Sequence, residues 1–132
     1  GRLSPLEAGE AVSVPAPLFF RAGYTDRQRN GVVLRPDYEP DDEILYGPKL
    51  PLPAGDYTYR MRFDTAAAPG TPLGGMQVRS AVMRSDVVAV TAGEEAAGLF
   101  STDAGNFPLR FGFTFARNAE LCIRSVTFTR VR

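Results

Sequence analysis

The chain contains no histidine, no tryptophan and only one cysteine. Without histidine it lacks the commonest general base and the commonest metal ligand, which excludes a histidine-dependent triad or zinc centre. Cys122 has no partner for an internal disulfide, and its apolar surroundings in the sequence favour a buried structural thiol over a nucleophile. The absence of tryptophan removes the best aromatic platform for stacking a sugar.

An excess of charge of one sign is also missing, because 15 basic and 15 acidic residues give a net charge of zero. No overall field therefore draws the chain to nucleic acid or to an anionic membrane. All basic residues except Lys49 are arginines, which either offer planar forks to carboxylates and phosphates or cover solvated strand faces. No apolar run approaches the ~20 residues of a membrane span, and the first ten residues lack the apolar segment of a signal peptide.

The length of 132 residues is typical of one domain with a single core. Residues 1–10 show no periodicity and are interpreted as a linker or lead-in, which leaves residues 11–132 as one domain. Short alternating segments, turn signals every 8 to 12 residues and no long helical period predict an all-β fold. We expect an antiparallel β-sandwich or jelly roll of about 8–10 short strands.

The clearest strand prediction is the stretch 56–63, in which Tyr57, Tyr59, Met61 and Phe63 alternate with polar residues. This period of two is typical of a half-buried strand, so both tyrosines are expected in the core. Prolines 48, 51 and 53 lack an amide donor, so residues 47–54 are expected to form an extended edge or a connection.

Two further strands are predicted near the C-terminus. Residues 107–115 place four phenylalanines and Leu109 on one parity, with Gly112 on the other face as bare backbone. Residues 120–131 change parity between Ile123 and Val126, which predicts a bulge or a change of sheet near Arg124.

Elsewhere the pattern is shorter. The Asn30-Gly31 pair predicts a hairpin turn, with residues 23–26 also interpreted as turn. Residues 76–83 predict a strand with a bulge or bend near its end, residues 87–90 a strand buried on both faces, and residues 91–98 a loop or at most one helical turn.

An acidic segment at residues 36–43 holds five of the fifteen acids, together with two prolines and Tyr38. This composition predicts an exposed loop. Its oxygens could bind Ca²⁺, although the spacing matches no EF-hand and a solvated loop remains the alternative. The candidate ligands are Asp37, Glu39, Asp41, Asp42 and Glu43.

The stretch YGPKLPLPAGDYTYRMRF at residues 46–63 carries a resemblance to a known family. It is similar to the YGP, PLPxG and alternating Tyr–Phe signature of galactose-binding-like β-sandwich modules of bacterial glycosyltransferases and surface-polysaccharide enzymes. The chain departs from that pattern at Lys49 and Asp56, and only residues 46–63 are specific. The resemblance implies a non-catalytic accessory module that contacts carbohydrate, with a cytoplasmic location favoured.

A sugar site requires exposed aromatic rings beside planar donors and acceptors, because pyranoses stack on rings and present pairs of hydroxyls. The predicted loops supply nine candidate residues. These are Tyr24, Asp26, Arg27, Asn30, Tyr38, Arg84, Asp86, Asp103 and Asn106. For each one, an ordinary solvated turn residue is the alternative.

Two other functions remain open from the sequence. A structural module could dock on a catalytic domain or on itself through the proline-rich stretch 47–54, without a sugar ligand. Paired acids such as Asp41 with Glu43, or Glu94 with Glu95, could in principle serve a glycosidase, but acids in polar loops are usually solvated. We therefore expect a carbohydrate-binding module, not an enzyme, whose partners are a glycan or polysaccharide and the parent protein's catalytic domains.

Overall fold

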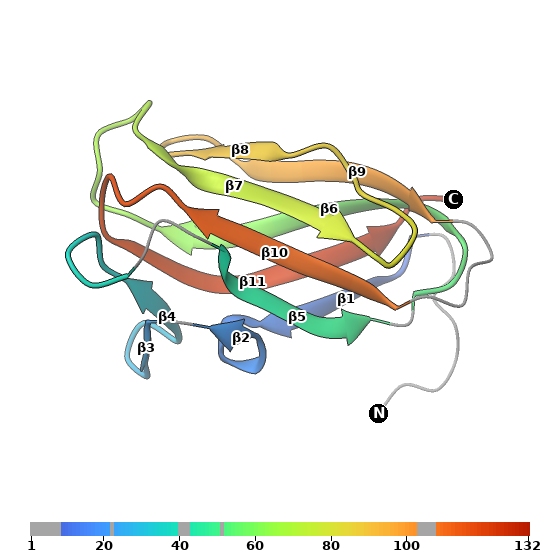
Figure 1. Cartoon of the computed structure of the whole chain (residues 1–132), viewed down its shortest axis with the longest axis horizontal. Coiled ribbons are helices and arrows are strands. Elements are labelled where there is room, and N and C mark those ends of the chain that lie inside the picture. The colour runs from blue at the N-terminus through green and yellow to red at the C-terminus, as the bar shows by residue number, and fades with distance from the viewer. Residues whose placement is uncertain (1–8, 22, 40–42, 51, 103–107) are drawn as a thin grey trace.

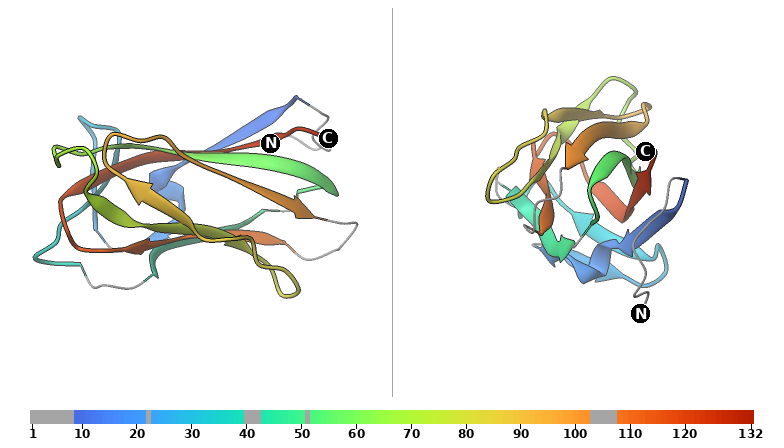
Figure 2. Two further views of the ribbon diagram at one scale, coloured as in Figure 1. Left: turned by 90° about the horizontal axis from the view of Figure 1, so that it is seen from above. Right: turned by 90° about the vertical axis from the view of Figure 1, so that its right-hand side faces the viewer.

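The computed structural model describes residues 9–21, 23–39, 43–50, 52–102 and 108–132. Within these ranges the chain forms two antiparallel sheets packed face to face (Figures 1 and 2). This confirms the predicted antiparallel β-sandwich, although the described residues contain eleven strands and not eight to ten. No helix in the described residues is both long and apolar enough to cross a lipid bilayer.

The larger sheet has six strands in the order β3-β4-β11-β6-β9, with β1 also paired to β11. Its strands are β1 (Ala11–Pro15), β3 (Tyr24–Asp26), β4 (Gly31–Leu34), β6 (Gly55–Asp64), β9 (Ala96–Thr102) and β11 (Leu121–Arg130). The smaller sheet has the order β2-β5-β10-β7-β8. It consists of β2 (Phe20–Arg21), β5 (Glu43–Leu50), β7 (Pro72–Arg79), β8 (Val88–Thr91) and β10 (Leu109–Phe115). A short 3-10 turn, η1 (Ala16–Leu18), joins β1 to β2.

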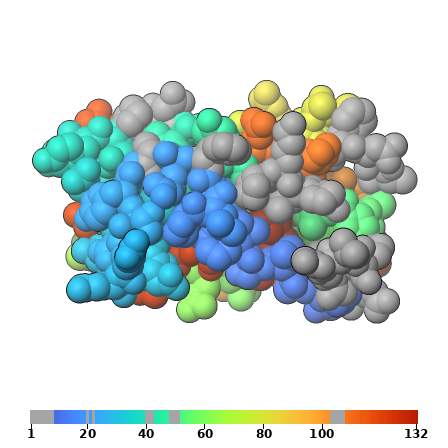
Figure 3. All heavy atoms as spheres, turned by 90° about the horizontal axis from the view of Figure 1, so that it is seen from below, coloured from blue at the N-terminus to red at the C-terminus, as the bar shows by residue number. Residues whose placement is uncertain are grey.

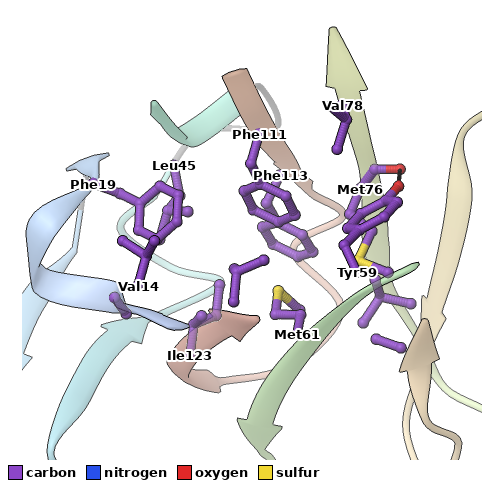
Figure 4. Close-up of a cluster of buried hydrophobic side chains, with 14 of the residues drawn as sticks. Val14, Phe19, Leu45, Tyr59, Met61, Met76, Val78, Phe111, Phe113 and Ile123 are labelled. Atoms are coloured by element: carbon purple, nitrogen blue, oxygen red, sulfur yellow. Dashed lines mark hydrogen bonds between the residues drawn. The ribbon is translucent and has the colours of Figure 1, made fainter. Parts of the chain in front are cut away.

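The core lies between the sheets and follows the alternation in the sequence. Tyr57, Tyr59 and Met61 of β6 are buried, as are Leu109, Phe111, Phe113 and Phe115 of β10. In Figure 4, Tyr59 and Met61 point toward Phe111, Phe113 and Met76, which come from the opposite sheet. The two strands with the clearest alternation in the sequence, β6 and β10, therefore meet at the centre of the sandwich.

Residues 47–50 of the proline-rich stretch belong to β5, which pairs with β10 along one side. On its other side, β2 pairs only with Leu45 and Tyr46. The part of β5 that contains Pro48 thus has no neighbour on that side within the described residues, so its missing amide hydrogen breaks no ladder there. The prediction of an extended edge is confirmed for this part of the chain.

The end of the chain also follows the predicted pattern. Ile123 pairs with Phe63 and Ser125 pairs with Arg62, so Arg124 is an extra residue in β11. This is the bulge that the change of parity indicated. Asn30 has φ of 55° and closes the hairpin between β3 and β4, which confirms the turn at Asn30-Gly31.

Several local predictions were wrong at strand boundaries. Residues 24–26 form β3 and are not turn, because β4 supplies a pairing partner for them. The strand predicted at residues 76–83 is β7, which runs from Pro72 to Arg79. The parity change after it is therefore the bend, and not the bulge, of the two predicted alternatives. Residues 96–98 belong to β9, which pairs with β6.

The strand near residue 88 was predicted to be buried on both faces, which is wrong. β8 lies at the edge of the smaller sheet and pairs only with β7 among the described strands. Val87 and Ala89 are exposed, and Val90 alone of this segment is buried. An unbroken run of apolar residues does not distinguish an edge strand from a central one.

The buried thiol and two buried phenols predict a loss of stability in alkaline solution. Burial raises the pKa of Cys122, Tyr57 and Tyr59 above their ordinary values. The unfolded chain then releases these protons at about pH 8.5 and 10, whereas the folded chain holds them, so the free energy of unfolding falls as pH rises through this range. Urea titrations from pH 7 to 11 should show the midpoint declining, and Cys122→Ala should remove the earliest part of the decline. A midpoint that stays constant to pH 11 would contradict the prediction.

Candidate functional site

The candidate site is a cluster of two exposed tyrosines and one arginine, carried by β3 and the turn after β4. The guanidinium carbon of Arg35 lies 4.8 Å from the ring centre of Tyr24 and 4.0 Å from that of Tyr38. Tyr24 is 40% exposed and Tyr38 is 71% exposed. A cation over the faces of two rings holds both rings in fixed orientation, which prepares their remaining surface for a ligand.

A tight turn brings these groups together. The backbone amides of Tyr38 and Glu39 both donate to the carbonyl of Arg35, at 3.1 Å and 3.0 Å. The Glu39 carboxylate accepts a hydrogen bond from the Arg35 amide and lies 3.9 Å from the Arg35 Nε. Arg117, from the turn between β10 and β11, donates to the carbonyl of Pro36 at 2.9 Å. Tyr38 is therefore fixed by its backbone while its side chain projects into solvent.

Arg35 keeps unused hydrogen-bonding capacity. Its Nε is buried without a hydrogen-bond partner, and its terminal nitrogens make no hydrogen bond to any described residue. Its side chain is still about one third exposed. Because a guanidinium presents donors in a planar fork, the outer donors can reach a pair of ligand hydroxyls beside the rings.

The neighbouring hairpin turn between β3 and β4 is closed by Asp26, which is committed to structure. Its Oδ1 accepts from the amides of Gln28 and Arg29 at 2.9 Å and 3.1 Å, and its Oδ2 lies 3.3 Å from the Arg29 Nε. Asn30 is also a turn residue, because its φ is positive. Arg27 is exposed and makes no contact of these kinds with another described residue. Of the four hairpin candidates, Tyr24 and Arg27 are the ones left available to a ligand.

The remaining sugar-site candidates lie elsewhere. Arg84 and Asp86 belong to the turn between β7 and β8, at the opposite end of the sandwich from β3 and β4 (Figure 1). Asp103 and Asn106 lie outside the described residues. A single site therefore cannot combine Tyr24 and Tyr38 with Arg84.

The calcium candidates are only partly described. Asp37 is exposed, whereas Glu39 is buried against Arg35 and the Glu43 carboxylate makes a two-pronged ion pair with Arg79 on the smaller sheet. Asp41 and Asp42 lie outside the described residues. Across the described part of the chain, no group of three or more metal-binding side chains comes together. Calcium binding stays a prediction.

A second tyrosine–arginine pair lies on the outer face of the smaller sheet. The Arg110 guanidinium is 5.7 Å from the ring centre of Tyr46, which is 36% exposed. The nearby ion pair of Glu43 and Arg79 lies over Gly112, where a Cβ would collide with the Glu43 carboxylate. The bare backbone predicted at Gly112 is thus occupied by the chain's own side chains.

Sequence reasoning found both tyrosines of the cluster but missed Arg35. In the sequence Arg35 follows the apolar run 32–34, where an arginine normally covers a solvated face. Its separation of three and four residues from Tyr38 and Glu39 was the available signal, because a single turn brings residues at that spacing together. Figure 3 shows the molecule from below the view of Figure 1. The first third of the chain, blue to cyan, forms much of the face seen there.

The fold and this cluster define an antiparallel β-sandwich with an aromatic surface built on β3 and the turn after β4. The sequence matches no known family model and no curated protein. Among solved structures, the chain is similar to the C-terminal CBM6 of LamC, a laminarinase from Zobellia galactanivorans, with a TM-score of 0.64 and 12% identity over 92% of this chain and 100% of that one. It is similar also to the carbohydrate-binding module CBM6cm-2 of Cellvibrio mixtus lichenase 5A, solved with cellotriose, with a TM-score of 0.58, 11% identity and coverage of 92% and 98%.

A third similar structure is the xylan-binding module CBM86 from Roseburia intestinalis. Its TM-score is 0.55 at 14% identity, over 92% of this chain and 96% of that chain. At these identities the likeness shows the fold. It covers nearly the whole of each module, so the single sandwich matches a complete domain in each of these proteins.

Proposed function

We propose that this chain is a non-catalytic carbohydrate-binding module that holds a glycan on the exposed rings of Tyr24 and Tyr38. The observation that carries the proposal is the placement of the Arg35 guanidinium over both rings, at 4.8 Å and 4.0 Å. Its fold neighbours include a module solved with cellotriose and a module described as xylan-binding, which supports the same class of ligand.

The mechanism of binding follows from the chemistry of a pyranose. One face of the sugar ring carries only C–H groups and stacks on an aromatic ring, while its edge carries paired hydroxyls. Arg35 lies over one face of each tyrosine, so the opposite face of the strongly exposed Tyr38 is free for the sugar. The terminal nitrogens of Arg35 then donate to adjacent hydroxyls, and the exposed Asp37 carboxylate can accept from another.

The role in a larger protein is a further part of the proposal. A module of this class raises the local concentration of a catalytic domain on its substrate without reacting itself. The similarity of residues 46–63 to modules of bacterial glycosyltransferases and surface-polysaccharide enzymes supports a glycan-processing parent protein. Tyr57 and Tyr59 of that stretch are buried, so the stretch contributes the fold and not the sugar contact.

Glycan-array screening followed by titration calorimetry tests the proposal. Tyr38→Ala should weaken binding at least tenfold, about 1.4 kcal/mol, because the stacking surface is lost. Tyr24→Ala should weaken it similarly. Tyr46→Ala is the matched control, because it removes an exposed tyrosine beside an arginine on a different surface, and it should bind as the unaltered chain does.

Two outcomes would contradict the proposal. Loss of binding in Tyr46→Ala alone would move the site to the outer face of the smaller sheet. If the chain binds no glycan on the array and associates with a catalytic partner domain, the alternative of a docking module would be favoured.

A further inference from the structure

A groove of about 740 Å³ opens on the outer face of the larger sheet, and none of its lining residues belongs to the tyrosine cluster. It lies over β6 and β11 and is walled by the turn between β8 and β9. It forms because β9 begins at Ala96, opposite Met61, so among the described strands none lies beside Arg62 and Asp64 on that side. The chain that precedes β9 leaves the sheet there, so Glu94 and Glu95 line one side of the groove.

Three arginines enter this groove from two adjacent strands. Arg60 and Arg62 are two residues apart on β6 and therefore share its outer face. Arg124 is the extra residue of the β11 bulge, and the bulge turns it onto the same face. Arg62 lies opposite Ser125, whose small side chain leaves space above it.

Two of the three arginines are neutralised by neighbours. The Arg60 Nε lies 2.7 Å from Glu95 Oε1, and the Arg124 Nε makes an ion pair with Asp64. Arg62 makes no ion pair or hydrogen bond through its side chain with any residue that the structure describes, and neither does the side chain of Glu94. The groove thus holds one unused guanidinium fork and one unused carboxylate between two satisfied pairs.

We propose that this groove is a second saccharide site, specific for sugars that carry a carboxylate, such as uronic acids. The Arg62 fork binds the sugar carboxylate through two parallel hydrogen bonds, and the Glu94 carboxylate accepts a hydrogen bond from a neighbouring hydroxyl. A neutral sugar would leave Arg62 unpaired, and a simple anion would leave Glu94 unpaired and repelled. The choice of a saccharide over another carboxylate rests on the proposed function.

Titration calorimetry of the full chain with oligogalacturonate, and with the same oligosaccharide after reduction of its carboxyl groups, tests the assignment. The acidic form should bind, and the reduced form should bind at least tenfold more weakly. Arg62→Gln should weaken binding of the acidic form about ten- to a hundredfold, and Arg62→Lys should recover only part of it, because lysine keeps the charge without the fork.

Arg84→Gln is the matched control, since it makes the same change of charge on an exposed turn at the other end of the sandwich. It should leave binding of oligogalacturonate unchanged. Equal losses in Arg62→Gln and Arg84→Gln would overturn the site, because binding would then follow net charge alone. Binding of hexaglutamate that depends on Arg62 and equals that of oligogalacturonate would also overturn it, since the groove would then take acidic peptides.

The same titrations separate this proposal from the one above. Tyr38→Ala should leave oligogalacturonate binding in the groove intact, whereas Arg62→Gln should leave neutral glycans on the tyrosine cluster. If neutral glycans do not bind but the acidic sugar still binds through Arg62, only the proposed tyrosine site is refuted. If neutral glycans bind and the acidic oligosaccharide binds no more tightly than its reduced form, only the proposed groove site is refuted.

Discussion

Replacing Tyr59 by alanine is expected to lower the free energy of unfolding by about 3–5 kcal/mol, the largest loss from any single substitution considered for this protein. Tyr59 is fully buried on β6. Its ring centre lies 5.7 Å from Phe100 and 6.2 Å from Phe128 in its own sheet, and 6.1 Å from Phe111 in the other sheet. Truncation removes the ring that joins the two sheets and leaves a cavity that rigid neighbouring strands cannot close.

The measurement is a pair of urea titrations, supported by thermal unfolding. At about 3–4 °C per kcal/mol for a chain of this length, the melting temperature should fall by about 9–20 °C. Tyr59→Phe is the matched control, because it keeps the ring and removes only the hydroxyl, which donates a long hydrogen bond of 3.5 Å to the Met76 carbonyl and also interacts with Ser85. It should cost less than about 1 kcal/mol. A Tyr59→Ala loss below about 2 kcal/mol would show that the core repacks around the missing ring.

Replacing Gly23 by alanine is expected to destabilise the chain by about 2–4 kcal/mol and to weaken glycan binding as well. Gly23 has φ of 81°, which disfavours any side chain. A Cβ there would lie 2.5 Å from the Val33 carbonyl oxygen and 2.8 Å from Leu34 Cδ2, so β3 would be pushed off β4. Because Tyr24 follows directly, this movement would displace its ring from Arg35.

Gly70→Ala separates the two causes. Gly70 has a similar φ of 93°, but nothing lies within 4 Å of its Cβ position. The Gly70→Ala variant should lose about 1–2 kcal/mol of stability, from backbone strain alone, and its glycan binding should be unchanged. Denaturant midpoints and calorimetry on both variants provide the comparison. Equal stability losses, or full glycan affinity in Gly23→Ala, would show that β3 and Tyr24 do not depend on the close packing of Gly23.

The strand core was predictable because its signal is local. Alternation at Tyr57, Tyr59 and Met61, and at Phe111 and Phe113, requires only that a strand bury one face. The bulge at Arg124 and the turn at Asn30 were predictable for the same reason, since each depends on a few neighbouring residues. β8 was misassigned because its position at a sheet edge depends on which strands lie beside it, and no local pattern records that.

The candidate site was half predictable. Tyr24 and Tyr38 stood out as aromatic residues in polar loops, but Asp26 and Asn30 also stood out and are occupied by the turn itself. Arg35 is decisive, and its role arises from one turn of backbone and from the pairing of β3 with β4. The groove at Arg62 could not be predicted from the sequence, because it exists only where β9 does not extend to the end of β6.

The sequence by itself determined that this chain is an antiparallel β-protein with one aromatic core, without histidine chemistry and without a net field. These properties depend on composition and on the period of two, which act within single strands. The tertiary structure alone decided which polar residues are free to bind. Whether an arginine is neutralised, stacked on a ring or left unpaired depends on side chains that are distant in sequence. Only the packing of the strands places Tyr24 and Tyr38 around Arg35 and leaves Arg62 without a partner among the described residues.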